Sequence, residues 1–247
     1  MIRSLRVLVL LWASCCFAVA ITVTPLTDAG FADVGTFNAV TMQGDLRGTL
    51  NYINLNPGTY TITFATGGTI TLGNHLPMIN QNQANSVTID GGSNVTINGA
   101  ALYRGLFVRQ GTQAAPVTIQ NLTITNCKAT GGTGGTRGGG GAGLGAGVFV
   151  GPETTQNGCF LNNITFSSCN ATGGNGGATG GSGGGGGMGG AGGLSNTASV
   201  GAGGGGLLGG AGGTSVAGGS TGGGAAGQGG DGATGGSPGS GGGGGGT

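Results

Sequence analysis

Few side chains in this sequence can do acid–base chemistry, and they do not cluster. After residue 20 the carboxylates stand singly, at Asp28, Asp33, Asp45, Asp90, Glu153 and Asp231, and the basic residues are Arg47, Arg104, Arg109, Lys128 and Arg137. Polysaccharide cleavage needs paired carboxylates, carboxylates around calcium, or a basic residue poised to take a proton. We therefore expect no catalytic residues, and a polysaccharide-active enzyme is kept only as an alternative.

Some of these charged groups lie beside predicted strands. Asp90 belongs to T-I-D-G, at a junction of strand and turn, where its side-chain oxygen is expected to cap the turn. Arg104 and Arg109 flank a short strand and alternate with Tyr103 and Phe107. This pattern is typical of ordinary solvated charges, with a carbohydrate-facing patch as the alternative.

Cysteine and histidine usage argues against metals and cofactors. Three cysteines follow residue 20, Cys127, Cys159 and Cys169, and an odd number excludes a closed disulfide framework. Cys127 and Cys169 occupy equivalent places in an internal repeat, so they are a possible disulfide; small buried side chains are the alternative. There is no C-x-x-C and His75 is the single histidine, so no metal site is expected. The glycine runs lack the strand, Lys-Ser or Lys-Thr and helix of a phosphate-binding loop.

The elements that must position these residues are short strands in which threonine alternates with β-branched or aromatic residues. They are predicted at residues 60–64, 69–72, 87–90, 95–98, 106–108, 117–120, 122–125, 147–150 and 164–167. Alternation gives each strand one buried and one solvated face, and strands this short must stack to be stable. The one candidate helix, from Asp45 to Ile53, has leucine and isoleucine at helical spacing.

Asparagines recur at the strand ends. Side-chain ladders or left-handed turns are expected at Asn98, Asn121, Asn126, Asn163 and Asn170. A competing interpretation is N-glycosylation, because N-x-T sequons start at Asn94, Asn121, Asn163 and Asn170.

An internal repeat decides the fold prediction. Residues 121–132 match residues 163–174 position by position, each with a strand, a cysteine, A-T and a glycine run. Such self-similarity marks a solenoid, in which each unit buries its face on its neighbours. The copies lie 42 residues apart, more than the roughly 20 to 27 residues of a plain β-helix turn, and the surplus is glycine. We predict an all-β parallel β-helix over residues 21–172, with residues 131–146 as a glycine-rich loop insertion.

Composition sets the remaining boundaries. With 68 glycines and 6 prolines in 247 residues, about 30% of the chain is of the low-complexity type. Residues 173–247 are a glycine-rich tract, expected to be disordered or loosely packed unless it pairs with something, and no period in it supports a packed bundle. Charged residues are only 5% and the net charge is +1, so nothing attracts nucleic acid or an anionic membrane.

Residues 1–20 predict export. Two arginines precede an apolar run from Val7 to Ala18, and Ala18-Val19-Ala20 offers a signal peptidase site with cleavage after Ala20. The run is too short for a transmembrane helix. An uncleaved anchor is one alternative, and a lipoprotein with Cys15 in a lipobox-like A-S-C is another.

These phrases together resemble a known family. T-L-N-Y-I-N, P-G-T-Y-T-I-T-F, V-T-I-D-G, V-T-I-N-G, R-G-L-F-V, N-L-T-I and G-A-G-V-F-V, spread from Thr49 to about Gly210, look like the passenger region of glycine-rich autotransporter adhesins and polymorphic outer membrane proteins.

The resemblance implies a right-handed parallel β-helix displayed on a cell surface. It also implies that the chain is the N-terminal part of a longer autotransporter, whose missing C-terminal anchor holds it in the outer membrane. The expected partners are ligands on host or neighbouring cells. A secreted structural or matrix protein is the alternative function.

Overall fold

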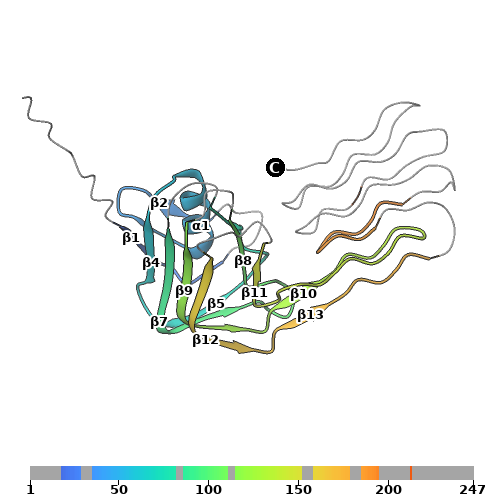
Figure 1. The fold of residues 1–247 in the computed structure, drawn as a ribbon. Coiled ribbons are helices and arrows are strands. Elements are labelled where there is room, and N and C mark those ends of the chain that lie inside the picture. Colours follow the sequence, from blue (N-terminus) through green and yellow to red (C-terminus); the bar gives the residue numbers. More distant parts are fainter. Residues whose placement is uncertain are drawn as a thin grey trace, which may run out of the picture.

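The computed structural model describes residues 18–28, 35–81, 86–110, 115–151, 158–178, 185–194 and 212. Most of the predicted signal peptide, and much of the predicted glycine tract, lie outside these residues. The described chain consists mostly of strands, with one helix, and of extended glycine-rich segments beside them (Figure 1).

The described residues contain one α-helix, α1 (Leu46–Leu55). Their strands are β1 (Val19–Val23), β2 (Phe37–Asn38), β3 (Gln43–Gly44), β4 (Tyr60–Phe64), β5 (Gly68–Thr71), β6 (Ile79–Gln81), β7 (Val87–Asn98), β8 (Leu106–Gln110), β9 (Val117–Thr125), β10 (Lys128–Thr130), β11 (Val148–Val150), β12 (Cys159–Ser167) and β13 (Asn170–Thr172). All nine predicted strands are confirmed, with small shifts at their ends. Two predicted pairs, in β7 and in β9, are continuous strands.

The strands form three sheets in which almost every pair is parallel. The largest sheet has the order β12-β9-β7-β4-β1-β3-β2, with β5 also paired to β7. A second sheet has the order β11-β8-β6, and β10 pairs with β13 in a third. The single antiparallel pair within these sheets joins β2 to β3. We call the parallel strands β1, β4, β5, β7, β9 and β12 the strand ladder.

In the strand ladder, residues of the same type stack on one another. Ile62 pairs with Ile89, which pairs with Ile119. In the neighbouring column Ile97 lies between Ile70 and Ile124. Threonines fill the outward columns between these positions. The buried column residues form one apolar core, so the predicted division into a buried and a solvated face is confirmed.

The ladder ends at β12, whose inward-facing residues are only half covered. Leu161 and Phe166 continue the columns of Ile119 and Ile124. They are nevertheless 42% and 48% exposed. The buried core therefore extends from β1 to β9.

Polar side chains form the predicted ladders at the turns. Asn121 Nδ2 donates to Asp90 Oδ1 at 3.0 Å, and Asn163 Nδ2 donates to Asn121 Oδ1 at 3.0 Å. Asn126 and Asn98 make a second column at 3.3 Å. Asn121, Asn126 and Asn163 have φ between 51° and 55°, a left-handed conformation that asparagine tolerates.

The helix α1 corrects the purely all-β prediction. Its residues Leu46, Leu50 and Ile53 are buried in the core, as the helical spacing indicated. Asp45 is its N-cap, because Asp45 Oδ1 accepts from the Gly48 N–H at 2.7 Å. Asp45 Oδ2 also accepts from the backbone and hydroxyl of Thr36, which ties the preceding loop to the helix.

The glycine-rich segments pair through their backbones at every third residue. The N–H groups of residues 131, 134 and 137 donate to the carbonyls of 172, 175 and 178, at 2.8 to 2.9 Å. The N–H groups of residues 174 and 177 donate to the carbonyls of residues 141 and 138, so these two segments run in opposite directions. A repeat of three residues is that of the polyproline II helix, which makes no hydrogen bonds within itself. We call residues 131–141, 173–178 and 185–192 the glycine bundle.

The bundle is packed too closely for side chains at its inward positions. A Cβ at Gly177 would overlap the carbonyl oxygen of Gly135. At the adjacent Gly176 the nearest atom would be 3.8 Å away, so that position faces outward. A loosely packed tract was expected unless it paired with something, and residues 173–178 and 185–192 do pair, with backbone groups of residues 131–141. The predicted loop insertion at 131–146 supplies those groups.

Candidate functional site

The candidate site is built around Arg104, which lies two residues before the start of β8. The turn before it is tight, because Ala100 and Ala101 both have positive φ and the Tyr103 N–H donates to the Gly99 carbonyl at 2.8 Å. Gly105 then lies against the backbone of Gly147, leaving no room for a Cβ. This contact places Arg104 against residues 144–147, the segment that leads into β11.

Arg104 is buried but forms no ion pair with any described residue. It is 4% exposed, and the structure contains no carboxylate within ion-pair distance of it among the described residues. Its Nε donates to the Leu144 carbonyl at 3.1 Å. Its guanidinium carbon lies 5.8 Å from the ring centres of both Phe107 and Phe149, in cation–π range. Burial lowers the pKa of Arg104, yet an arginine stays charged in proteins.

His75 lies next to Arg104 and is neutral. Its Nδ1 accepts from the Arg104 N–H at 3.2 Å, which assigns the proton of the neutral ring to Nε2. Its ring meets that of Tyr103 edge to face, with centres 5.5 Å apart. Burial, followed by the positive charges of Arg104 and Arg47, lowers the pKa of His75 to about 4. At neutral pH the ring is therefore an uncharged hydrogen-bonding group.

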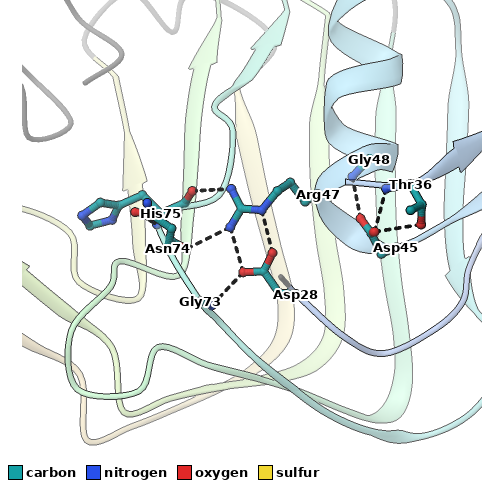
Figure 2. A network of polar contacts seen from close by, with 8 residues as sticks. All are labelled: Asp28, Thr36, Asp45, Arg47, Gly48, Gly73, Asn74 and His75. Atoms are coloured by element: carbon teal, nitrogen blue, oxygen red, sulfur yellow. Dashed lines mark hydrogen bonds and ion pairs between the residues drawn. The ribbon is translucent and has the colours of Figure 1, made fainter. Parts of the chain in front are cut away.

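A buried ion pair behind His75 fixes the segment that carries it (Figure 2). Arg47, on α1, binds Asp28 through two hydrogen bonds of 2.6 and 2.7 Å, with side chains 4% and 1% exposed. Arg47 also donates to the carbonyls of Asn74 and His75, at 3.1 and 2.8 Å. Asp28 accepts from the Gly73 N–H at 2.8 Å. The charges of Arg47 and Asp28 thus cancel while they position the 73–75 loop.

Arg104 and His75 line a cavity of about 200 Å³. Its other walls are Leu102, Ala129 and Thr130, from the turn before β8 and from β10, and Met188 and Gly189, from the glycine bundle. The ladder region and the glycine bundle therefore meet at this cavity, and both contribute to its surface.

The structure corrects the predicted role of Arg104 and confirms that of Asp90. Arg104 is not a solvated charge, whereas Arg109, five residues later, is exposed. Asp90 caps its turn, since its Oδ1 accepts from the Gly92 N–H at 2.9 Å. The bonds from Gly92, Gln120 and Asn121 lower the pKa of Asp90. None of the contacts of Asp90 involves Arg104, so the two do not form one site.

Sequence reasoning missed His75 and the pair of Arg47 with Asp28. His75 and Arg104 are 29 residues apart, about one turn of the predicted solenoid, and that separation is the one signal that could have joined them. Asp28 and Arg47 were predicted to stand singly, but they form a buried ion pair. Of the other charged candidates, Asp33, Glu153 and Asp231 lie outside the described residues. Lys128 is exposed, and Arg137 has its φ at 59° within the glycine bundle.

Cys127 and Cys169 occupy matching positions, each directly before one of the paired strands β10 and β13. The Asn170 N–H donates to the Cys127 carbonyl at 2.9 Å, and β10 and β13 pair directly after the two cysteines. Cys127, Cys159 and Cys169 are free thiols in the structure. Burial, then the neighbouring Cys169, raises the pKa of Cys127 to about 12. The disulfide between Cys127 and Cys169 stays a prediction, with a protonated, slowly reacting Cys127 as its starting state.

Among the described residues, no three histidine, cysteine, aspartate or glutamate side chains lie close enough together to hold a metal ion. Within the same ranges, the structure has no helix of the length and apolarity needed to cross a membrane.

Comparison with known proteins supplies no relative from which a role could be transferred. No family model matches the chain, and no curated protein and no solved structure matches it either.

Proposed function

We propose that the chain is an exported, rod-forming β-helix that binds ligands at a cell surface or outside the cell, as adhesin passengers do, and that it does so without catalysis. One observation carries this proposal: Arg104 is buried beside a cavity with no described carboxylate to balance it. Burying an unpaired charge is costly, which favours a site where a ligand completes the pair.

The stacking of the strands supports the parallel β-helix. From β4 onward, each turn supplies a strand to the largest sheet and another to the second sheet, as in the succession β7, β8 and β9. Right-handedness belongs to the proposal as well, since parallel crossovers within one sheet take that hand almost always. A cysteine pair placed at Thr88 and Thr118, which are register partners, should oxidise to a disulfide; a pair at Thr88 and Gln120 should not.

The exposure of the first residues of β1 is compatible with export and cleavage after Ala20. Ile21 and Val23 are fully buried, whereas Val19 and Ala20 are exposed. Cleavage there would remove Val19 and Ala20 and leave the buried residues Ile21 and Val23 of β1 in place. N-terminal sequencing of the protein recovered from the medium or surface of producing cells should therefore begin at Ile21. A sequence beginning at Met1 would contradict the proposed cleavage and favour the uncleaved anchor, and absence of the protein from medium and surface would contradict the proposed export.

A binding assay tests the proposed function directly. Fluorescently labelled mature protein, residues 21–247, should be retained on intact cells or on a panel of immobilised glycans. Arg104→Gln should lower this retention, and Arg109→Gln, which removes the same charge from an exposed position, should not. If the unaltered protein is retained on none of these surfaces, the binding proposal is wrong.

The glycine bundle favours a second candidate, a secreted structural protein. Its segments associate through backbone groups alone, a mode of contact that copies of the same chain could repeat. Sedimentation of the mature protein over a range of concentrations separates the two candidates. Concentration-dependent assembly favours the structural role, and a monomer favours the binding role.

A further inference from the structure

We infer that the cavity between Arg104 and the glycine bundle binds a small organic monocarboxylate, such as the carboxylate group of an acidic sugar. The inference rests on the proposed binding function and deepens it by naming the class of ligand. Four features of the site support it: the free groups of Arg104, the charge balance, the aromatic support of the guanidinium, and the dimensions of the cavity.

The free groups of Arg104 suit a carboxylate. Its Nε is already bound to the Leu144 carbonyl. Among the described residues, neither of its two Nη groups has a hydrogen-bond acceptor, and neither is fully buried, so both remain accessible to a ligand. Two Nη groups at the end of a planar guanidinium match the two oxygens of a carboxylate, so that two parallel hydrogen bonds can form.

The charge balance of the site favours a single negative charge. Asp28 neutralises Arg47, and His75 is uncharged because its Nδ1 is an acceptor. Arg104 therefore leaves one uncompensated positive charge at the cavity. A monoanion cancels it, whereas a phosphate dianion would leave a negative charge buried without a partner, which is costly.

The aromatic rings hold the guanidinium without neutralising it. Phe107 and Phe149 meet edge to face, with ring centres 4.9 Å apart, and Arg104 packs against both. A purely structural arginine is usually held by carboxylates, as Arg47 is in this structure. The phenyl rings fix the position of Arg104 and leave its charge for a ligand.

The cavity suits a small ligand. Its volume, about 200 Å³, is below the roughly 300 to 1,000 Å³ of sites for drug-sized molecules, so one sugar ring or a short acid fits. Leu102, Ala129 and Met188 supply apolar walls, and Thr130 supplies a hydroxyl for a ligand hydroxyl.

The test is titration calorimetry on the mature protein with D-glucuronate, acetate, D-glucose and sulfate. Glucuronate should bind, acetate should bind more weakly at the same site, and glucose, which lacks the carboxylate, should not bind. Binding of sulfate in preference to glucuronate would overturn the inference, since that would assign the site to a tetrahedral oxyanion.

Three variants connect the binding to this cavity. Arg104→Gln should weaken glucuronate binding by on the order of tenfold or more, because it removes charged hydrogen bonds. Arg109→Gln should leave the affinity unchanged. Leu102→Trp, at an exposed wall residue, should narrow the cavity and weaken binding while Arg104 stays in place, so the test holds even if Arg104→Gln fails to fold.

The outcomes separate this inference from the proposed function. Retention on cells or glycans without glucuronate binding overturns the carboxylate site and leaves the binding function standing. Glucuronate binding that is lost equally in Arg104→Gln and Arg109→Gln places the ligand elsewhere and also overturns the inference. Glucuronate binding without retention on any surface supports the site and removes the adhesin-like role.

Discussion

The strand ladder and the glycine bundle satisfy the same requirement by different means. Both must pair the backbone groups that folding removes from water. In the ladder, strands pair in register and aliphatic columns such as Ile62, Ile89 and Ile119 bury apolar surface. In the bundle, inward positions have no side chain, and carbonyl groups fill the space where a Cβ would stand. Apolar burial thus stabilises the ladder, whereas the bundle relies on hydrogen bonds and close backbone contact.

Removing an inward side chain from the ladder should produce the largest effect. Ile119 is itself fully buried, between Ile89 and Leu161 in its column, so Ile119→Ala leaves a cavity and should lower the free energy of unfolding by about 2 to 5 kcal/mol. Urea denaturation followed by far-ultraviolet circular dichroism measures the change. The control Thr118→Ala, at the adjacent outward position, should change it by no more than about 0.5 kcal/mol. Equal losses in both variants would contradict the division into faces.

Adding one methyl group to the bundle should have the next largest effect. Gly177→Ala forces a Cβ onto the Gly135 carbonyl and should cost about 1 to 3 kcal/mol by overpacking, while Gly176→Ala, facing outward, should be tolerated. Amide hydrogen exchange should show lost protection at Gly134 and Gly177 in the first variant only. If protection in the ladder falls to the same extent, the two regions unfold as one unit and the comparison must be revised.

The junction between the two regions should respond to pH. The pKa of His75 is about 4 in the folded protein and about 6.5 in the unfolded chain. Between these values the unfolded chain binds more protons, so stability falls as the pH falls from 6.5 to 4, by about 1 to 3 kcal/mol. Urea midpoints across this range should show the slope.

The variant His75→Gln isolates this pH effect. It should be less sensitive to pH between 6.5 and 4 than the unaltered protein. Asp90, whose pKa is lowered, affects stability at lower pH, because its contribution is lost only as the pH falls through its folded-state value. An unchanged slope in His75→Gln would assign the pH dependence to other groups.

The smallest expected effect concerns a polar atom in the apolar core. The Thr49 hydroxyl, on α1, is the one buried side-chain oxygen or nitrogen of the described residues that has no hydrogen-bond partner. Thr49→Val keeps the shape and removes the unpaired group, so stability should be unchanged or rise by up to about 1 kcal/mol. Thermal unfolding compares it with Thr71→Val on the exposed face of β5, which should have little effect. A clear loss of stability in Thr49→Val alone would indicate that the hydroxyl is bound to water.

The two regions also differ in how far the sequence predicts them. The V-T-I phrases predict strands at residues 87–90 and 117–120 correctly, because alternation reports directly which face is buried. The helix was visible only as the spacing of Leu46, Leu50 and Ile53. The glycine bundle left no pattern, because its period of three lies in backbone hydrogen bonds and no side chain records it.

The candidate site was predicted only in part. Arg104 stood out beside Phe107, yet the alternation suggested a solvated charge, because the sequence does not show that residues 144–147 return over it. His75 looked isolated because its partner lies 29 residues away. Asp28 and Arg47 are joined by the position of α1, which no local pattern specifies.

The sequence by itself determined the strand-rich architecture, the stacking of repeated units, and the turn roles of Asp90 and the asparagines, since each depends on local alternation or local hydrogen bonding. Only the tertiary structure decided that Arg104 is buried without an ion-pair partner among the described residues, that His75 is neutral beside it, and that glycine segments pack as a bundle. The physical reason is that these features depend on contacts between residues tens of positions apart. Such contacts follow from the register of the stacked strands and of the backbone segments.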